Sequence, residues 1–144
     1  MKFKVMTTIF ALVLAASVSA DSERNGQLLV TKECTQYTGA AGSFCTITSS
    51  NIPEIKVGSK VVYGQAAGIP AGMLDSNVVL EVGTGNWAVG RCTLDLGTGL
   101  GICTFSDGTG PLAGFQARVD VSPPTDGKNW HWTGTYSFGP EPDR

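Results

Sequence analysis

The residues that could act as a nucleophile or as a general acid or base in this sequence do not form a known catalytic pattern. His131 is the only histidine, so a Ser-His-Asp site would have to use it. It shares one face of an alternating stretch with Thr133 and Thr135, which predicts an outward-facing surface side chain. The sequence contains no G-x-S-x-G motif around a nucleophilic serine. The sequence therefore predicts no particular reaction.

Two glycine-dense segments resemble phosphate-binding loops at first sight. They are Gly97-Thr98-Gly99-Leu100-Gly101 and Gly108-Thr109-Gly110. Neither has the G-x-G-x-x-G spacing, and neither precedes a helical pattern whose N-terminus could hold an anion. We interpret both segments as tight turns between strands.

The four cysteines, Cys34, Cys45, Cys92 and Cys103, predict two disulfides if the chain is exported. Three pairings are possible. The equal spacing within the first two and within the last two favours Cys34 with Cys45 and Cys92 with Cys103, each across one hairpin. A zinc site is the competing use, but there is no C-x2-C pair and only one histidine, so we expect no metal.

A ligand pocket, if present, would use polar-tipped aromatic and charged residues on the predicted strands. These candidates are Tyr63, Arg91, Trp130, Trp132 and Tyr136. Core packing is the favoured interpretation for the two tryptophans, because large apolar side chains fill small barrels. Tyr136 needs a hydrogen-bond partner if it is buried. The direction of Arg91 depends on which face holds its neighbour Cys92.

The first twenty residues are typical of an export signal. Lys2 and Lys4 precede an apolar run over 5–18, and Val18-Ser19-Ala20 is a suitable cleavage site. The run is shorter than the about 20 residues that span a bilayer. We expect a signal peptide over 1–20, a flexible leader over 21–26, one β-barrel domain over 27–138 and a flexible tail over 139–144. The mature protein would then be secreted or periplasmic, without a membrane span.

Charge argues against nucleic acid and anionic membrane surfaces as partners. The chain has ten basic and twelve acidic residues, and removal of Lys2 and Lys4 leaves eight basic residues and a net charge of −4. Phosphate binding relies on clustered lysine and arginine, which this balance does not offer.

Hydrophobic patterning predicts an all-β fold. Eight strands are expected, over 27–36, 43–50, 57–63, 77–82, 87–94, 101–106, 112–122 and 129–138. In the seventh, Phe115, Ala117, Val119 and Val121 share one face. Closure into a single eight-stranded antiparallel up-and-down barrel would remove the unpaired edges of an open sheet. A two-sheet sandwich is the alternative.

The segment Thr104 to Val119, TFSDGTGPLAGFQARV, followed by Trp130-His131-Trp132-Thr133-Gly134-Thr135-Tyr136, resembles the allene oxide cyclase and dirigent superfamily. The resemblance covers about 57–138, and within that family the chain is most similar to small exported bacterial proteins. It implies an eight-stranded barrel whose apolar cavity holds a small molecule and steers an isomerisation or cyclisation by positioning, without a cofactor. The polar pocket residues of the plant enzymes have no one-to-one match here.

Two functional hypotheses follow. The first is a barrel that binds a small apolar molecule, with isomerase or cyclase activity. The second is a non-catalytic, disulfide-stabilised structural or protein-interaction module. An interior cavity of a few hundred Å³ would support the first, and a filled barrel would support the second.

Overall fold

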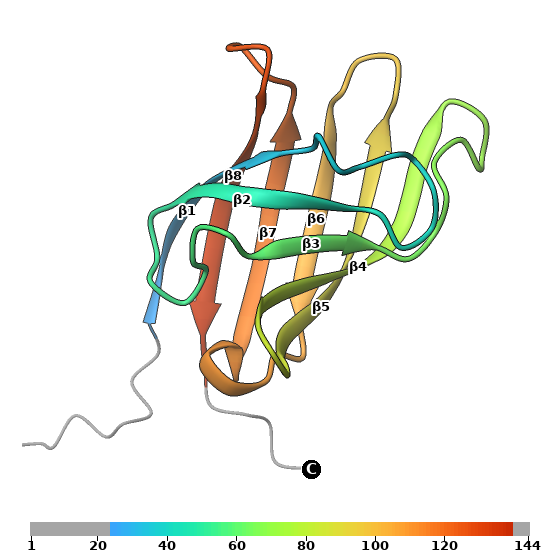
Figure 1. Ribbon diagram of the computed structural model, residues 1–144. Helices are drawn as coiled ribbons and strands as arrows, with labels where there is room; N and C mark the ends of the chain where they lie inside the picture. Colours follow the sequence, from blue (N-terminus) through green and yellow to red (C-terminus); the bar gives the residue numbers. More distant parts are fainter. Residues whose placement is uncertain (1–23, 140–144) are drawn as a thin grey trace, which may run out of the picture.

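A computed structural model describes residues 24–139 as one closed barrel of eight antiparallel strands in chain order (Figure 1). The strands are β1 (Arg24–Glu33), β2 (Phe44–Ser50), β3 (Lys60–Tyr63), β4 (Met73–Gly83), β5 (Asn86–Asp95), β6 (Gly101–Ser106), β7 (Phe115–Ser122) and β8 (Asn129–Phe138). A short 3-10 helix, η1 (Gly110–Leu112), lies between β6 and β7. The predicted signal peptide and the residues from 140 onward lie outside the described residues.

The barrel closes between β1 and β8, which confirms the predicted barrel and excludes the sandwich. These two strands pair over ten residues, from Arg24 opposite Phe138 to Glu33 opposite Asn129. β2 and β3 cross in front of β6 and β7 at a steep angle in Figure 1. Strands in a closed barrel must tilt in this way, and closure leaves no sheet edge unpaired.

Backbone constraints explain where the strands depart from the predicted ranges. β3 starts at Lys60 rather than Val57 because Gly58, at φ +92°, turns the chain just before it. β7 starts at Phe115 rather than Leu112 because Pro111 and the positive φ of Gly114 place a 3-10 turn there. β1 covers 24–33 instead of 27–36, so Arg24 to Gly26 belong to the strand.

Side chains alternate between the barrel interior and the outside, as period-two patterning requires. In β7 the predicted inward set, Phe115, Ala117, Val119 and Val121, is buried. In β8 Trp132 is 1% exposed and its neighbour Thr133 is exposed. The interior is filled by large side chains that are fully buried, among them Trp132, Phe115, Leu28, Ile47, Ile55, Leu80 and Leu112.

The two ends of the barrel differ. One end carries the β2–β3 and β6–β7 connections, the latter with η1 at the bottom of Figure 1. Leu112 of η1 and Ile52 and Ile55 of the β2–β3 connection are buried there and close the interior. We call this the plugged end. The opposite end contains the last residues of β1, β3, β5 and β7 and the first residues of their neighbours.

Both disulfides lie at that opposite end, which we call the disulfide end. Cys34 is bonded to Cys45 and Cys92 to Cys103, the pairing that the spacing favoured. Cys92 and Cys103 are direct cross-strand partners in β5 and β6, with their Cα atoms 4.2 Å apart. The bonds therefore tie neighbouring strands of two hairpins.

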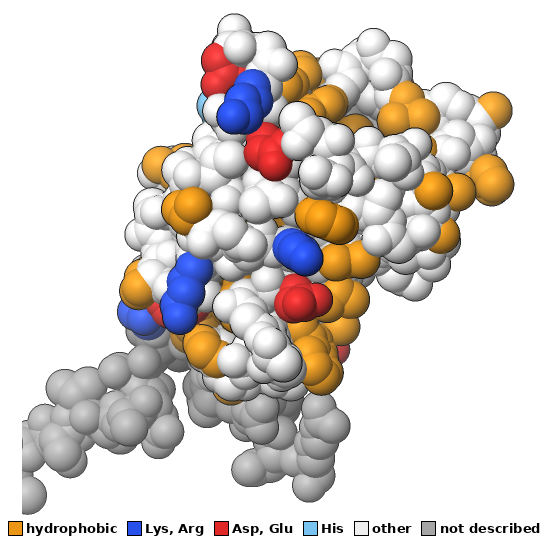
Figure 2. Space-filling model, viewed as in Figure 1, with side chains coloured by type: hydrophobic (Ala, Val, Ile, Leu, Met, Phe, Trp, Pro, Cys, Tyr) orange, Lys and Arg blue, Asp and Glu red, His pale blue; other side chains and the backbone are white. Residues whose placement is uncertain are grey.

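The outer surface carries few charges. On the face seen in Figure 2, the blue and red side chains form a few small groups separated by uncharged and apolar side chains. Exposed apolar side chains include Trp87, Val89, Leu100 and Ile102 on or between β5 and β6. Within residues 24–139 no helix is long and apolar enough to cross a membrane.

Candidate functional site

The five sequence-predicted site residues do not form one cluster. Tyr63 and Trp132 are buried inside the barrel, and Trp130 is half-buried at the disulfide end. Arg91 lies outside, because Cys92 points inward. Tyr136 is half-buried towards the plugged end, where its ring lies within 3.3 Å of the position that a Cβ on Gly26 would take. Ligand contact by these residues stays a prediction.

Tyr63 and Trp132 surround a residue that the sequence reasoning did not single out, Lys32. Lys32 is 3% exposed, and its Nζ donates a hydrogen bond to the Tyr63 hydroxyl. The Nζ lies 4.8 Å from the centre of the Trp132 ring and 5.1 Å from that of Tyr63. Burial lowers the pKa of Lys32 to about 7, since water no longer solvates the ammonium. The amine is therefore poised between its charged and neutral forms near neutral pH.

A small cavity of about 60 Å³ adjoins this amine at the disulfide end. Its lining includes Lys32, Tyr63 and Tyr37, the last from the β1–β2 connection. The four cysteines of the two disulfides also line it. The Tyr37 ring lies 4.9 Å from the Tyr63 ring, and its hydroxyl is buried without a hydrogen-bond partner among the described residues. Burial raises the pKa of Tyr37, and burial together with Tyr37 raises that of Tyr63. Both phenols stay protonated and able to donate.

The size of this cavity decides against a bulky guest. Ligand pockets for drug-sized molecules span several hundred Å³, whereas this cavity holds only a few atoms. The barrel interior also contains fully buried core side chains such as Trp132, Val119 and Ile47. The barrel interior found here is thus closer to the filled barrel of the second hypothesis than to the apolar chamber of the first.

A much larger depression, of about 1230 Å³, lies on the outside of the barrel across β4 to β8 and the start of β1. We call it the outer trough. One wall is a row of directly paired, outward-facing residues: Asn77, Arg91, Thr104, Arg118 and Thr135. The other wall comprises Val79, Val89, Ser106, Gln116, Ser137 and Asn25. Between the walls runs a row of residues that includes Gly90, Phe105 and Ala117.

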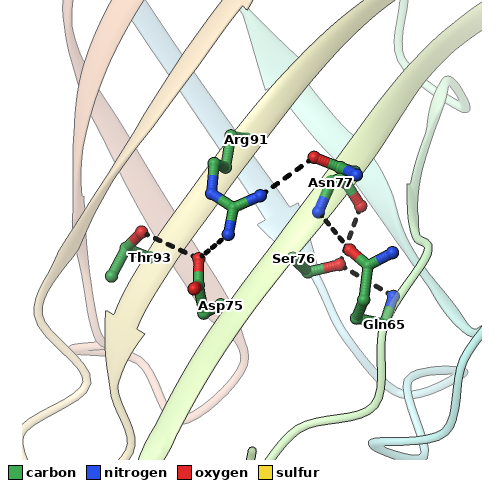
Figure 3. Close-up of polar contacts among 6 residues, drawn as sticks. All are labelled: Gln65, Asp75, Ser76, Asn77, Arg91 and Thr93. Atoms are coloured by element: carbon green, nitrogen blue, oxygen red, sulfur yellow. Dashed lines mark hydrogen bonds and ion pairs between the residues drawn. The ribbon is translucent and has the colours of Figure 1, made fainter. Parts of the chain in front are cut away.

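An ion pair and a hydrogen bond hold Arg91 in place on the first wall (Figure 3). Its guanidinium lies 2.7 Å from Asp75 Oδ1 in an ion pair and donates a hydrogen bond to Asn77 Oδ1 at 3.1 Å, and both partners lie on the neighbouring strand β4. Thr93 donates to the same Asp75 oxygen at 3.4 Å. The ion pair is exposed, so it contributes little to stability. Its effect is to fix the direction of the guanidinium.

The loop after β3 supports the same region of β4. The Gln65 side-chain oxygen accepts a hydrogen bond from the backbone N–H of Asn77, and the Gln65 N–H donates to Ser76 Oγ at 3.0 Å (Figure 3). β3 ends at Tyr63, so these bonds occupy β4 groups that β3 no longer reaches. The wall around Asn77 and Arg91 is therefore built on a fixed backbone.

Arg118 is the second cation of the outer trough. It is exposed and stands opposite Thr104, with Arg91 on the other side of that threonine. Within residues 24–139 the two ion pairs found are Arg24–Glu54 and Arg91–Asp75, so Arg118 has no carboxylate partner there. No aspartate or glutamate is among the described residues that line the trough. The trough thus contains one cation without a carboxylate partner, Arg118, and one, Arg91, that is paired with Asp75 beside the lining.

One sequence signal could have located the buried amine. Lys32 interrupts the buried series Leu28 and Val30 at the next inward position of β1, so it is a charged residue on an apolar face. The positions of Arg91 and Arg118 on either side of Thr104 depend on strand register, which the sequence alone does not give. Nothing in the sequence places Tyr37, which lies in a connection, against Tyr63.

The fold and these sites define a class, the small disulfide-stabilised antiparallel β-barrel with a packed interior. Comparison with protein-family models, curated proteins and solved structures finds no match to this chain.

Proposed function

We propose that this protein is an exported, non-catalytic interaction module that binds its partner in the outer trough. The observation that carries the proposal is the contrast in size between the two spaces. The cavity beside Lys32 measures about 60 Å³, whereas the outer trough measures about 1230 Å³ and is lined by side chains that can donate and accept hydrogen bonds.

Export to the periplasm or the exterior is part of the proposal. Two disulfides persist in oxidising compartments and are rare where thiols are kept reduced. The basic and apolar pattern over 1–20 supports the same conclusion from the sequence.

The partner we propose is an acidic segment of another protein. Arg91 and Arg118 flank Thr104. The Arg118 guanidinium has no carboxylate partner among the described residues, whereas the Arg91 guanidinium is paired with Asp75 and oriented by it. Guanidiniums bind carboxylates through paired N–H groups, and hydroxyl and amide side chains nearby can bond a peptide backbone. Val79 and Val89 on the opposite wall suit apolar side chains within such a segment.

Titration with a fluorescent oligoglutamate peptide tests this function. We expect saturable binding that weakens as salt rises, and we expect Arg118→Glu to weaken it at least about tenfold, equivalent to about 1.4 kcal/mol. Lys128→Glu is the matched control. It makes the same charge reversal in the exposed β7–β8 turn, away from the trough, and should change affinity far less.

Two results would contradict the proposed function. Absence of binding, or equal loss in the two variants, would reject the trough as the binding face. Binding of an oligosaccharide of uronic acids but not of the peptide would replace the protein partner with an anionic glycan.

We also propose a distant relationship to the allene oxide cyclase and dirigent superfamily. It is supported by the strand number and the chain-order pairing, and by the position of the resembling segment across the turn from β6 to β7. The isomerase or cyclase activity of that hypothesis would need a larger chamber than the cavity beside Lys32.

A further inference from the structure

Lys32 is an amine held inside a protein without an acidic partner. Lysine side chains normally extend their ammonium to water, and a buried charge is normally paired. Neither holds here: Lys32 is 3% exposed, and neither of the ion pairs within residues 24–139 includes it. Its Nζ hydrogen-bonds to the Tyr63 hydroxyl, a neutral group.

The surroundings of this amine are uncharged on every strand that contributes to the cavity. Tyr63 comes from β3 and Tyr37 from the β1–β2 connection, and these phenols are the titratable groups that face it. The rest of the lining is Cys34, Cys45, Leu74, Cys92, Thr93, Leu94, Cys103, Val121 and Trp130. A neutral amine is favoured there, and burial holds the pKa of Lys32 at about 7. A neutral lysine amine is a nucleophile towards carbonyl carbon.

The cavity gives a small molecule a route to the amine. Deep lining residues such as Lys32 and Tyr63 are buried, whereas Trp130 and Leu94 are half-buried. The lining therefore runs from the core to the surface at the disulfide end. At about 60 Å³ the space equals roughly two waters at about 30 Å³ each, enough for a molecule of a few heavy atoms.

A hydroxyl in the same cavity lacks a partner. The Tyr37 Oη is buried and has no hydrogen bond among the described residues, although burying an unsatisfied hydroxyl is costly. A carbonyl oxygen in the cavity would accept from such a donor. The amine and the free hydroxyl together therefore select a small molecule with one electrophilic carbonyl.

We propose that Lys32 captures a small aldehyde or ketone as an imine in the cavity at the disulfide end. The Lys32 nitrogen bonds to the carbonyl carbon, and a proton moves from nitrogen to the carbonyl oxygen to give a carbinolamine. The oxygen then takes a second proton from the nitrogen and leaves as water, and the C=N bond forms. Amine and carbonyl give imine and water, with no oxidant or reductant. Tyr37 and Tyr63 supply hydroxyls that hydrogen-bond the oxygen and relay its protons.

The test uses acetaldehyde as the probe on the intact, disulfide-bonded protein at pH 7.5, with cyanoborohydride to reduce any imine. Peptide mapping then locates the ethyl groups. We expect Lys32 to be ethylated at least about tenfold faster than the exposed Lys56, Lys60 and Lys128, because an amine with a pKa near 7 is mostly neutral at this pH. Benzaldehyde, which is too large for the cavity, should reverse this preference.

Two variants distinguish imine formation at Lys32 from simple burial of its amine. Tyr37→Phe keeps the ring and removes the free hydroxyl, so it should slow ethylation of Lys32 without changing that of Lys60. Lys32→Arg should abolish the ethylated peptide. Ethylation of the exposed lysines with Lys32 left unmodified in the wild-type protein would overturn the proposal, as would equal reaction of Lys32 with acetaldehyde and benzaldehyde. These outcomes are independent of peptide binding in the outer trough.

Discussion

Lys32 makes the stability of the barrel depend on pH in an unusual direction. Its pKa is about 7 in the folded protein and about 10.4 in an unfolded chain. Between these two values the unfolded state binds a proton that the folded state does not, so stability falls as pH is lowered through this window. The penalty is complete below about pH 7 and absent above about pH 10.4.

Substitution of Lys32 with methionine should remove this dependence. At pH 6 Lys32→Met gains on the order of 5 kcal/mol from the lost penalty, at about 1.4 kcal/mol per pH unit. The Tyr63 hydroxyl that loses its partner offsets part of this gain by about 1–3 kcal/mol. Urea unfolding at pH 6 and at pH 10 should therefore show a gain at pH 6 that shrinks or reverses at pH 10. Lys56→Met, at an exposed position, is the control. A wild-type curve parallel to that of Lys32→Met would contradict the assignment of a desolvated amine.

Gly90 is required for close contact between β5 and β6. A Cβ at this position would lie 2.2 Å from the Thr104 carbonyl oxygen and 2.6 Å from the Phe105 ring. Gly90→Ala should therefore destabilise the protein by about 1–3 kcal/mol through overpacking. Gly83→Ala is the matched control, because the nearest atom to its Cβ would be a side-chain nitrogen at 3.6 Å. Thermal unfolding compares the two, and equal stability of both variants would refute the packing argument.

At the scale of the strands, the disulfides act on two separate hairpins. Each closes a loop with a sequence separation of 11, so the chain-entropy model gives each about 3 kcal/mol of stability. The paired variants Cys34→Ala/Cys45→Ala and Cys92→Ala/Cys103→Ala should each lose about that amount in urea unfolding. The loops are equal in length, so the chain-entropy contribution of the two disulfides is the same. A difference between the two losses of unfolding free energy therefore reports how each disulfide packs in the folded protein. No loss in either variant would show that the bonds do not contribute to stability.

The strands themselves could be predicted well from the sequence, because alternation and turn residues are local signals. The inward and outward faces of β7 and β8 and the hairpin pairing of the cysteines follow from such signals. Strand ends were less predictable where one residue changes the backbone, as Gly58 does before β3 and Gly114 does before β7.

At the scale of the whole barrel, the sites depend on register and closure, which the sequence does not specify. Arg91 and Arg118 lie 27 positions apart and become neighbours of Thr104 only through two strand pairings. Lys32 and Tyr63 meet inside the barrel because β1 and β3 both end at the disulfide end. A correct prediction of all eight strands does not predict the volume of the interior cavity, because that volume depends on how the side chains from all strands pack together.

We propose that the packed interior supports the barrel while the outer trough binds a partner. NMR of the nitrogen-15-labelled protein during titration with oligoglutamate tests this most directly, because each backbone amide reports its own surroundings. We predict chemical-shift changes at Gly90, Thr104, Phe105, Ala117 and Arg118, which line the outer trough. Amides of the disulfide end, such as those of Lys32 and Cys45, should stay unchanged. Shifts confined to the disulfide end, or no shifts anywhere in the spectrum, would contradict binding in the outer trough.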